Sequence, residues 1–85
     1  MAQYRVIVRK SVSKDLKGVP KKDVRRILSA IQSLADYPRP PGTKKLSGRE
    51  RYRLRQGNYR ILYEIEDERL IVCVVRVGNR RDVYR

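Results

Sequence analysis

A two-residue turn between two alternating segments constrains this chain more strongly than any other feature. Gly57-Asn58 is typical of tight β-hairpin turns, and the residues on either side alternate between apolar and polar. The turn length fixes the register of a hairpin, so Arg55 is expected directly opposite Arg60. The other expected pairs of the ladder are Gln56 with Tyr59, Leu54 with Ile61, and Arg53 with Leu62.

The two faces of this hairpin differ in chemistry because side chains alternate along a strand. One face gathers apolar and tyrosine side chains: Tyr52, Leu54, Tyr59, Ile61, Tyr63 and Ile65. The other face gathers guanidinium groups: Arg51, Arg53, Arg55 and Arg60. Like charges directly opposite one another destabilise a sheet by some fraction of a kcal/mol. Folding alone gives no reason to collect arginines there, and an anionic partner supplies one.

The overall charge indicates the same class of partner. The 85 residues include 22 Lys and Arg against 9 Asp and Glu, a formal net charge of +13. This excess is larger than solubility requires, so nucleic acid is the first expected partner. The same charge repels itself in the folded state, and an acidic protein that neutralises it would stabilise the fold. The length fits one domain, residues 1–85.

We expect neither metal nor cofactor in this protein. Cys73 is the single cysteine and there is no histidine, so a disulfide and the usual zinc-site spacings cannot be built. Cys73 lies in an apolar run and is interpreted as a small buried hydrophobe. The segment MAQYRVIVRK lacks a signal-peptide core, and no stretch approaches the ~20 apolar residues of a membrane span. We therefore expect a cytoplasmic protein that does not bind a membrane.

Hydrophobic periodicity predicts an α+β domain of order β-α-α-β-β-β. The expected strands span residues 3–9, 51–56, 59–65 and 69–77. Two N-terminal helices are expected on one face of this mainly antiparallel four-stranded sheet, with a short C-terminal tail over the other face. Between the two halves, the segment Pro38-Arg39-Pro40-Pro41-Gly42 is expected to be an irregular connector.

Both helices have recognisable boundaries. A short helix is expected from a cap at Ser11 or Ser13 to Lys17, and a longer one from Pro20 to about Tyr37. The longer helix has an apolar stripe that we expect to lie on the sheet: Val24, Ile27, Leu28, Ile31, Leu34 and Ala35. Its polar residues are interpreted as a solvated outer face: Lys21, Lys22, Arg25, Arg26 and Gln32.

Basic residues concentrate in two further stretches. Eight Lys or Arg residues and one Glu lie from Arg39 to Arg60, and residues 76–85 contain four arginines and one Asp. Gly78 is expected to end the last strand and to release a tail across the side of the sheet opposite the helices. Tyr84 would then stack on an unpaired base while arginines hold its phosphate. In the plainer interpretation, Tyr84 and its neighbour Val83 only cover the sheet edge.

Three segments carry a resemblance to a known family: YRLRQGNYRILYEI, VVRVGNRRDVYR and SLADYPRPPGTKKLSG. Together with the order of elements, they closely resemble the RelE/ParE superfamily of bacterial and archaeal toxins over nearly the whole chain. The resemblance implies a compact domain held inactive in a hetero-oligomer by a cognate acidic antitoxin such as RelB. In the RelE branch it implies ribosome-dependent cleavage of mRNA in the A site, whereas ParE members poison DNA gyrase and are not nucleases.

The chain resembles the RelE branch more, because that branch has counterparts of the basic strand residues and of the terminal tyrosine. By position, the resemblance implies a catalytic set of Arg53, Arg55, Arg60, Arg80 and Tyr84. The corresponding residues bind the scissile phosphate, orient the attacking 2′-hydroxyl and protonate the leaving 5′-oxygen, which is RNA self-cleavage assisted by electrostatics. An outer set is expected to bind RNA: Lys44, Lys45, Arg49, Arg51 and Arg81.

Two positions depart from the family pattern. The best-known RelE toxins have lysines where this chain has Arg53 and Arg55, and an arginine keeps its proton where a desolvated lysine can lose it. Arg55 is therefore assigned to phosphate binding, and Tyr84 is the better candidate for deprotonating or orienting the 2′-hydroxyl. Many relatives also have histidine in place of Asn79. Two rival functions stay open: a gyrase poison of ParE type, and a module without activity that only binds its antitoxin or acts as a DNA corepressor.

Overall fold

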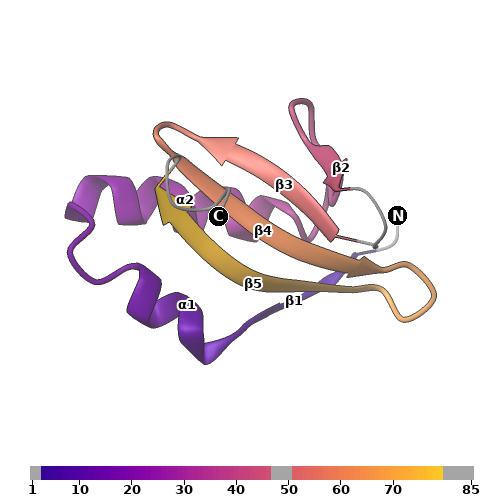
Figure 1. The fold of residues 1–85 in the computed structure, drawn as a ribbon. Coiled ribbons are helices and arrows are strands. Elements are labelled where there is room, and N and C mark those ends of the chain that lie inside the picture. The colour runs from indigo at the N-terminus through magenta and orange to yellow at the C-terminus, as the bar shows by residue number, and fades with distance from the viewer. Residues whose placement is uncertain (1–2, 47–50, 80–85) are drawn as a thin grey trace.

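The computed structural model describes residues 3–46 and 51–79, which form two helices and one mixed sheet (Figure 1). The helices are α1 (Lys10–Asp15) and α2 (Lys21–Ser33). The strands are β1 (Arg5–Val8), β2 (Lys44–Leu46), β3 (Arg51–Gln56), β4 (Tyr59–Glu66) and β5 (Ile71–Asn79). Their order in the sheet is β1-β5-β4-β3-β2. The predicted α+β class is confirmed, with one strand more than the four expected.

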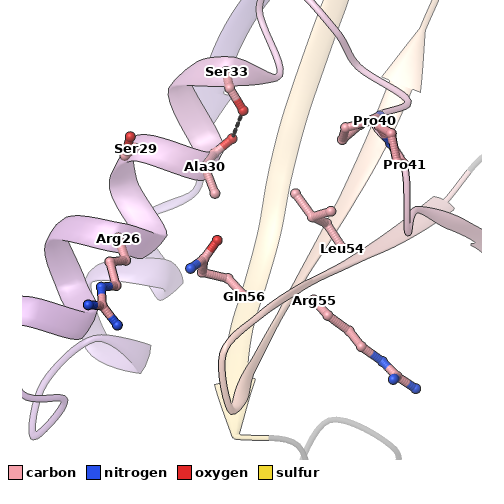
Figure 2. Close-up of a pocket in the computed structure, with 9 residues that line it drawn as sticks. All are labelled: Arg26, Ser29, Ala30, Ser33, Pro40, Pro41, Leu54, Arg55 and Gln56. Carbon is pink, nitrogen blue, oxygen red and sulfur yellow. Dashed lines mark hydrogen bonds between the residues drawn. The ribbon is translucent and has the colours of Figure 1, made fainter.

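The β3–β4 hairpin has the register that its turn predicts. Arg55 pairs with Arg60, and Leu54 pairs with Ile61. Gly57 has a φ of 60° and Asn58 does not have a positive φ, which fits a type II′ turn with glycine at its first central position. Leu54 and Arg55 leave β3 on opposite sides, one towards α2 and one away from it (Figure 2). The two chemically different faces predicted for the hairpin are therefore present.

β5 is an inner strand, antiparallel to β4 and parallel to β1. β1 is shorter than the predicted residues 3–9. Beyond the end of β1, the residue before α1 and the last residue of α1 form hydrogen bonds along the same edge of β5. The Arg9 N–H donates to the Val74 carbonyl at 3.1 Å, and the Asp15 carboxylate accepts the Val77 N–H at 3.0 Å. The backbone of β5 thus stays hydrogen-bonded beyond the last residue of β1.

The predicted cap of the first helix was wrong. α1 starts after Arg9, and no side chain makes a capping hydrogen bond there. The Ser13 hydroxyl donates instead to the Lys10 carbonyl at 2.7 Å, and the Ser11 hydroxyl reaches the Val75 carbonyl at 3.5 Å. Serines inside a short helix use their hydroxyls on the preceding turn or on a neighbouring strand, so their presence did not mark its start.

The second helix is shorter than predicted. Pro20 is its N-cap, and α2 ends at Ser33 instead of near Tyr37. The N–H groups of Ala35 and Asp36 donate to carbonyls three residues earlier, so the chain tightens into a turn after the helix. The apolar spacing continues through this turn and therefore did not reveal where the helix stops.

The strands differ from the prediction at two places. β2 is a three-residue edge strand, antiparallel to β3, in a segment where no strand was expected. β5 continues through Gly78 to Asn79, so the prediction that Gly78 ends the last strand was wrong. Gly78 lies directly opposite Arg60 in the ladder. A glycine within a strand leaves open the space that a side chain would fill, so no β5 side chain stands opposite Arg60 at this position.

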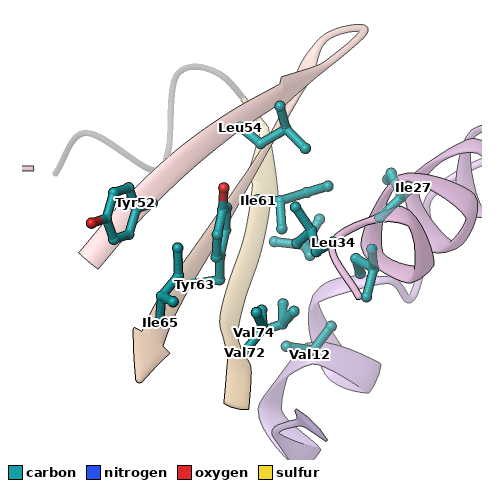
Figure 3. Packing of buried hydrophobic residues seen from close by; sticks show 12 residues of the cluster. Val12, Ile27, Leu34, Tyr52, Leu54, Ile61, Tyr63, Ile65, Val72 and Val74 are labelled. Atoms are coloured by element: carbon teal, nitrogen blue, oxygen red, sulfur yellow. The ribbon is translucent and has the colours of Figure 1, made fainter. Parts of the chain in front are cut away.

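α2 packs its apolar stripe on the sheet and forms the core (Figure 3). Ile27 and Leu34 are completely buried and face Ile61 of β4 and Val74 of β5. Leu28, which was expected in the same stripe, is 44% exposed, because it lies at the margin of the buried face. The polar residues predicted to face outwards from this helix are exposed: Lys21, Lys22, Arg25, Arg26 and Gln32.

The tyrosines on the helix side of the hairpin belong to the core, as predicted. Tyr63 is completely buried, and its ring stacks on that of Tyr52 with 5.9 Å between the ring centres. The Tyr63 hydroxyl donates to the Pro38 carbonyl at 2.7 Å, which attaches the Pro-rich connector to the sheet. Burial raises the pKa of Tyr63 above its ordinary value. Tyr59, nearer the turn, is half-buried.

A second set of contacts attaches the connector to the acidic turn between β4 and β5. The Arg39 guanidinium donates two hydrogen bonds to the Asp67 carboxylate, at 2.9 and 3.1 Å, and lies 5.0 Å from the centre of the Tyr52 ring. The Tyr4 hydroxyl donates to the same carboxylate at 2.6 Å. These hydrogen bonds, those from Arg39 foremost, lower the pKa of Asp67 to about 2. Arg39 is therefore engaged in holding the fold together.

Candidate nucleic-acid interface

Five arginines lie on the side of the sheet opposite α2 and form what we call the arginine face: Arg51, Arg53, Arg55, Arg60 and Arg76. The β3–β4 register places Arg53 opposite Leu62, and the β4–β5 register places Leu62 opposite Arg76. Directly opposed residues share a face, so these three side chains form one row across three strands. Arg76 was not among the predicted site residues, because strict alternation from Val72 and Val74 would put it on the helix side. Only the register shift between Leu62 and Tyr63 in the β4–β5 ladder brings it to this face.

Arg60 is the buried centre of this face. Its side chain is only 1% exposed, although a guanidinium group keeps its charge in proteins. On β3 it is opposed by Arg55, and on β5 by Gly78, which has no side chain. Removing a charge from water is costly, and a chain selected only for stability would place an apolar residue here. The position therefore indicates a role for the charge itself.

Arg53 and Arg55 sit on either side of Leu54 and differ in exposure. Arg53 is 8% exposed, whereas Arg55 is an exposed residue that extends away from α2 (Figure 2). The described members of the predicted catalytic set, Arg53, Arg55 and Arg60, therefore share one face at the turn end of the hairpin. A buried guanidinium beside an exposed one concentrates positive potential where an anion can approach from solvent.

The outer RNA-binding set is divided between the two faces. Lys44 of β2 lies opposite Arg53, so it extends the arginine face to the edge of the sheet. Lys45 lies opposite Tyr52, which places it with the residues of the helix side. Four predicted site residues lie outside the residues that the structure describes: Arg49, Arg80, Arg81 and Tyr84. Asn79 is the last described residue and pairs with Tyr59.

One carboxylate on this side of the sheet was overlooked at the sequence level. Glu64 lies opposite Arg51 on β3 and Cys73 on β5. Its carboxylate accepts a hydrogen bond from Arg51 at 3.1 Å and lies 3.9 Å from the Arg9 guanidinium. Cys73 is half-buried beside it, not fully buried as expected. The face is thus cationic at the turn end and partly neutralised at the other end.

Two grooves flank α2, and Arg55 of the arginine face lines the first of them. One of about 470 Å³ runs between α2 and β3 and includes Arg26, Ser33 and Gln56 in its lining (Figure 2). The other, of about 420 Å³, lies between α2 and β1 and is mainly apolar, with Val8 and Leu28 each 44% exposed. Within residues 3–46 and 51–79, no group of three or more His, Cys, Asp or Glu side chains is arranged to hold a metal ion.

A comparison with models of known protein families shows which family the chain belongs to. The model of the ParE toxin of type II toxin-antitoxin systems, parDE, matches residues 6–84. The chain belongs to this toxin family. The RelE/ParE resemblance of the sequence is thereby confirmed. Toxin RelG of Mycobacterium tuberculosis is 34% identical to this toxin over 96% of the chain and 97% of its own length.

Solved structures of RelE-RelB complexes match the toxin over nearly its whole length. The RelE chain of the archaeal RelE-RelB complex from Pyrococcus horikoshii OT3 matches with a TM-score of 0.83 and 31% identity, over 96% of this chain and 99% of that one. The RelB-RelE complex from Methanococcus jannaschii matches with a TM-score of 0.72 and 30% identity, over 92% and 94%. The toxin is thus a type II toxin with a RelE-like fold. α2, with 13 residues, is too short to cross a membrane, and no other helix in the described part of the chain can do so.

Proposed function

We propose that this toxin is a ribosome-dependent endoribonuclease of RelE type that cleaves mRNA in the A site and so inhibits translation in the cytoplasm. The observation that carries the proposal is the common face of Arg53, Arg55 and Arg60, with Arg60 buried in the middle of the sheet. Such a charge, costly for folding, is useful where negative charge develops during a reaction. Arg80 and Tyr84 complete the proposed site.

The proposed reaction is an in-line attack within the RNA. The 2′-hydroxyl oxygen bonds to the adjacent phosphorus as the bond from phosphorus to the 5′-oxygen breaks, which leaves a cyclic phosphate and a 5′-hydroxyl. Arg53, Arg55 and Arg60 stabilise the extra negative charge on the phosphoryl oxygens. They are poor proton acceptors because guanidinium groups remain protonated. Tyr84 orients or deprotonates the 2′-hydroxyl, and a proton is returned to the leaving 5′-oxygen.

Primer extension on mRNA paused on purified ribosomes tests this function. Wild-type toxin should give cleavage within the A-site codon, and Arg55→Gln, Arg80→Ala and Tyr84→Phe should each abolish it or reduce it strongly. Arg25→Gln is a matched control, because Arg25 is an exposed arginine on α2. Its removal changes the net charge equally and should leave cleavage unchanged. Absence of cleavage by the wild type would refute the proposed activity.

A second candidate function is inhibition of DNA gyrase without nuclease activity. The match to the ParE family model favours it, and so does the presence of arginine where the RelE resemblance leads one to expect lysine. A supercoiling assay with purified gyrase distinguishes the two. Inhibited supercoiling together with intact mRNA would select the ParE-type function, and no effect in either assay would leave a module that only binds its antitoxin or DNA.

We also propose a cognate acidic antitoxin of RelB type as the partner in a hetero-oligomer. The net charge of +13 supports it, as do the RelB complexes in which similar RelE chains have been solved. The apolar groove between α2 and β1 offers one surface for an amphipathic acidic segment, because its exposed Leu28 and Val8 lie beside the basic outer side of α2. Co-expression with the antitoxin should raise both yield and thermal stability.

A further inference from the structure

Glu64 introduces a negative charge into the side of the sheet that we propose to bind RNA. It lies on β4, four residues beyond Arg60 and on the same side of the sheet. Its side chain is 34% exposed, so solvent reaches the carboxylate. An acidic residue within a phosphate-binding surface opposes binding, and its presence requires a physical reason.

Two arginines from different segments of the chain converge on this carboxylate. Arg51 of β3 contacts one carboxylate oxygen at 3.1 Å, and Arg9, which follows β1, lies 3.9 Å from the other. Arg51 is 29% exposed and Arg9 is 56% exposed. Both guanidinium groups could reach a bound phosphate if the carboxylate were absent, because carboxylate and phosphate oxygens use the same donors.

The effect of Glu64 is local. Four residues along a strand correspond to about 13 Å, which exceeds the Debye length of about 8 Å at physiological ionic strength. Glu64 therefore leaves the potential around the exposed Arg55 largely intact, while it offsets part of the charge of Arg51 and Arg9. The sheet is divided into a strongly cationic half at the hairpin turn and a less cationic half beyond it.

We propose that Glu64 is a positioning residue that sets the limit of the RNA-binding surface. It withholds Arg51 and Arg9 from the RNA backbone and so confines the RNA to the half of the arginine face around the exposed Arg55 and Arg76. This inference rests on the proposed RNA-directed function and assigns to Arg51 a role different from the direct RNA contact expected from the sequence. The boundary fixes the position of the RNA along the sheet. A uniformly basic sheet would let the RNA slide, whereas a bounded basic surface holds a single phosphate in place.

The test measures how RNA affinity depends on salt. A fluorescein-labelled oligouridylate of about 12 nucleotides is titrated with the toxin between about 50 and 200 mM NaCl. Each additional phosphate contact with single-stranded RNA steepens the plot of log Kd against log salt by about 0.7. Glu64→Gln should therefore bind more tightly at low salt, with a slope steeper by up to about 1.4, because two arginines are released.

Two variants separate this role from a general change in charge. Glu66→Gln changes the net charge equally and also releases an arginine, because Glu66 lies 3.4 Å from Arg69, but it does so at the far end of the hairpin. Its slope should equal that of the wild type. The double variant Glu64→Gln/Arg51→Gln restores the wild-type net charge and should lose about half of the gain in slope, or about 0.7, because only Arg9 is then released.

The outcomes distinguish the inference from the function on which it rests. Salt-dependent RNA binding by the wild type, with equal slopes for Glu64→Gln and Glu66→Gln, would overturn the positioning role and leave the RNA-directed function standing. No binding of the oligouridylate by the wild type would overturn the positioning role, while the ribosome-dependent function is judged separately by the primer-extension assay. A steeper slope for Glu64→Gln alone, reduced in the double variant, is the expected result, and thermal unfolding of each variant verifies that the fold is intact.

Discussion

Arg55 lies directly opposite Arg60 across the β3–β4 ladder, so two permanent positive charges face each other in adjacent strands. Opposed like charges destabilise a sheet, and this pair has a buried member. Arg55→Gln should therefore stabilise the toxin by about 0.2–1 kcal/mol while it weakens RNA binding and cleavage. A rise in stability combined with a loss of activity is the signature of a residue kept for function.

Urea unfolding followed by circular dichroism measures the first effect, and anisotropy with labelled RNA measures the second. Arg25→Gln on the exposed side of α2 is the control and should change neither quantity appreciably. If Arg55→Gln were destabilising, the opposed pair would have to be compensated by contacts that outweigh the repulsion, and the inference from strain to function would fail.

The turn residue Gly57 should be far less replaceable than its neighbour. Its φ of 60° lies in a region that side chains disfavour, whereas Asn58 does not share it. Gly57→Ala should cost about 1–2 kcal/mol, and Asn58→Ala should stay within about 0.5 kcal/mol of the wild type. Thermal unfolding of the two variants checks this. Equal losses would indicate that the turn relaxes to another type.

Local information explains which parts of the fold the sequence predicts. The bounds of β3 and the pairing of Arg55 with Arg60 follow from a two-residue turn and strict alternation, which involve only neighbouring residues. β2 has only three residues, two of them lysines, so it has no alternation to recognise and becomes a strand only because β3 lies beside it. Gly78 resembles a strand end in sequence, yet the strand continues because Gly78 and Asn79 still pair with β4.

The candidate site also has some features that local sequence predicts and others that depend on distant contacts. The shared face of Arg53, Arg55 and Arg60 is a consequence of periodicity and could be predicted. The contact of Arg9 with Glu64 joins residues far apart in the chain, through a parallel pairing that no local pattern encodes. Summed charges along the sequence therefore overestimate how much of the basic surface is available to an anionic partner.

Two adjacent residues of α2 should respond very differently to truncation. Ile27 is completely buried and Leu28 is 44% exposed, although both belong to the apolar stripe. Ile27→Ala should cost about 2–5 kcal/mol because it leaves a cavity under the sheet, a large part of the stability of a domain this small. Leu28→Ala should cost less than about 1 kcal/mol and should instead weaken co-purification with the antitoxin if the groove is used. Comparable losses of stability for both variants would contradict the burial pattern.

The contact of Asp67 with Arg39 should make stability sensitive to acid. The pKa of Asp67 is lowered from 3.8 to about 2 by hydrogen bonds from Arg39 and Tyr4. A depressed folded-state pKa contributes stability that is present above the unfolded value and is lost as pH falls through the folded one. The melting temperature of the wild type should therefore fall more steeply between pH 4 and pH 2 than that of Asp67→Asn.

Arg39→Gln provides the matched control for this acid sensitivity, because it removes the largest cause of the shift and keeps the carboxylate. Its melting temperature should follow pH less steeply than that of the wild type but more steeply than that of Asp67→Asn, because the hydrogen bond from Tyr4 still lowers the pKa of Asp67. The Asp67 side chain is 53% exposed and that of Arg39 is 42% exposed, so solvent screens the pair and the difference should shrink further in high salt. Identical acid profiles for the wild type and both variants would show that the contact contributes nothing to stability, and the Pro-rich connector would then be held mainly by the hydrogen bond from Tyr63 to Pro38.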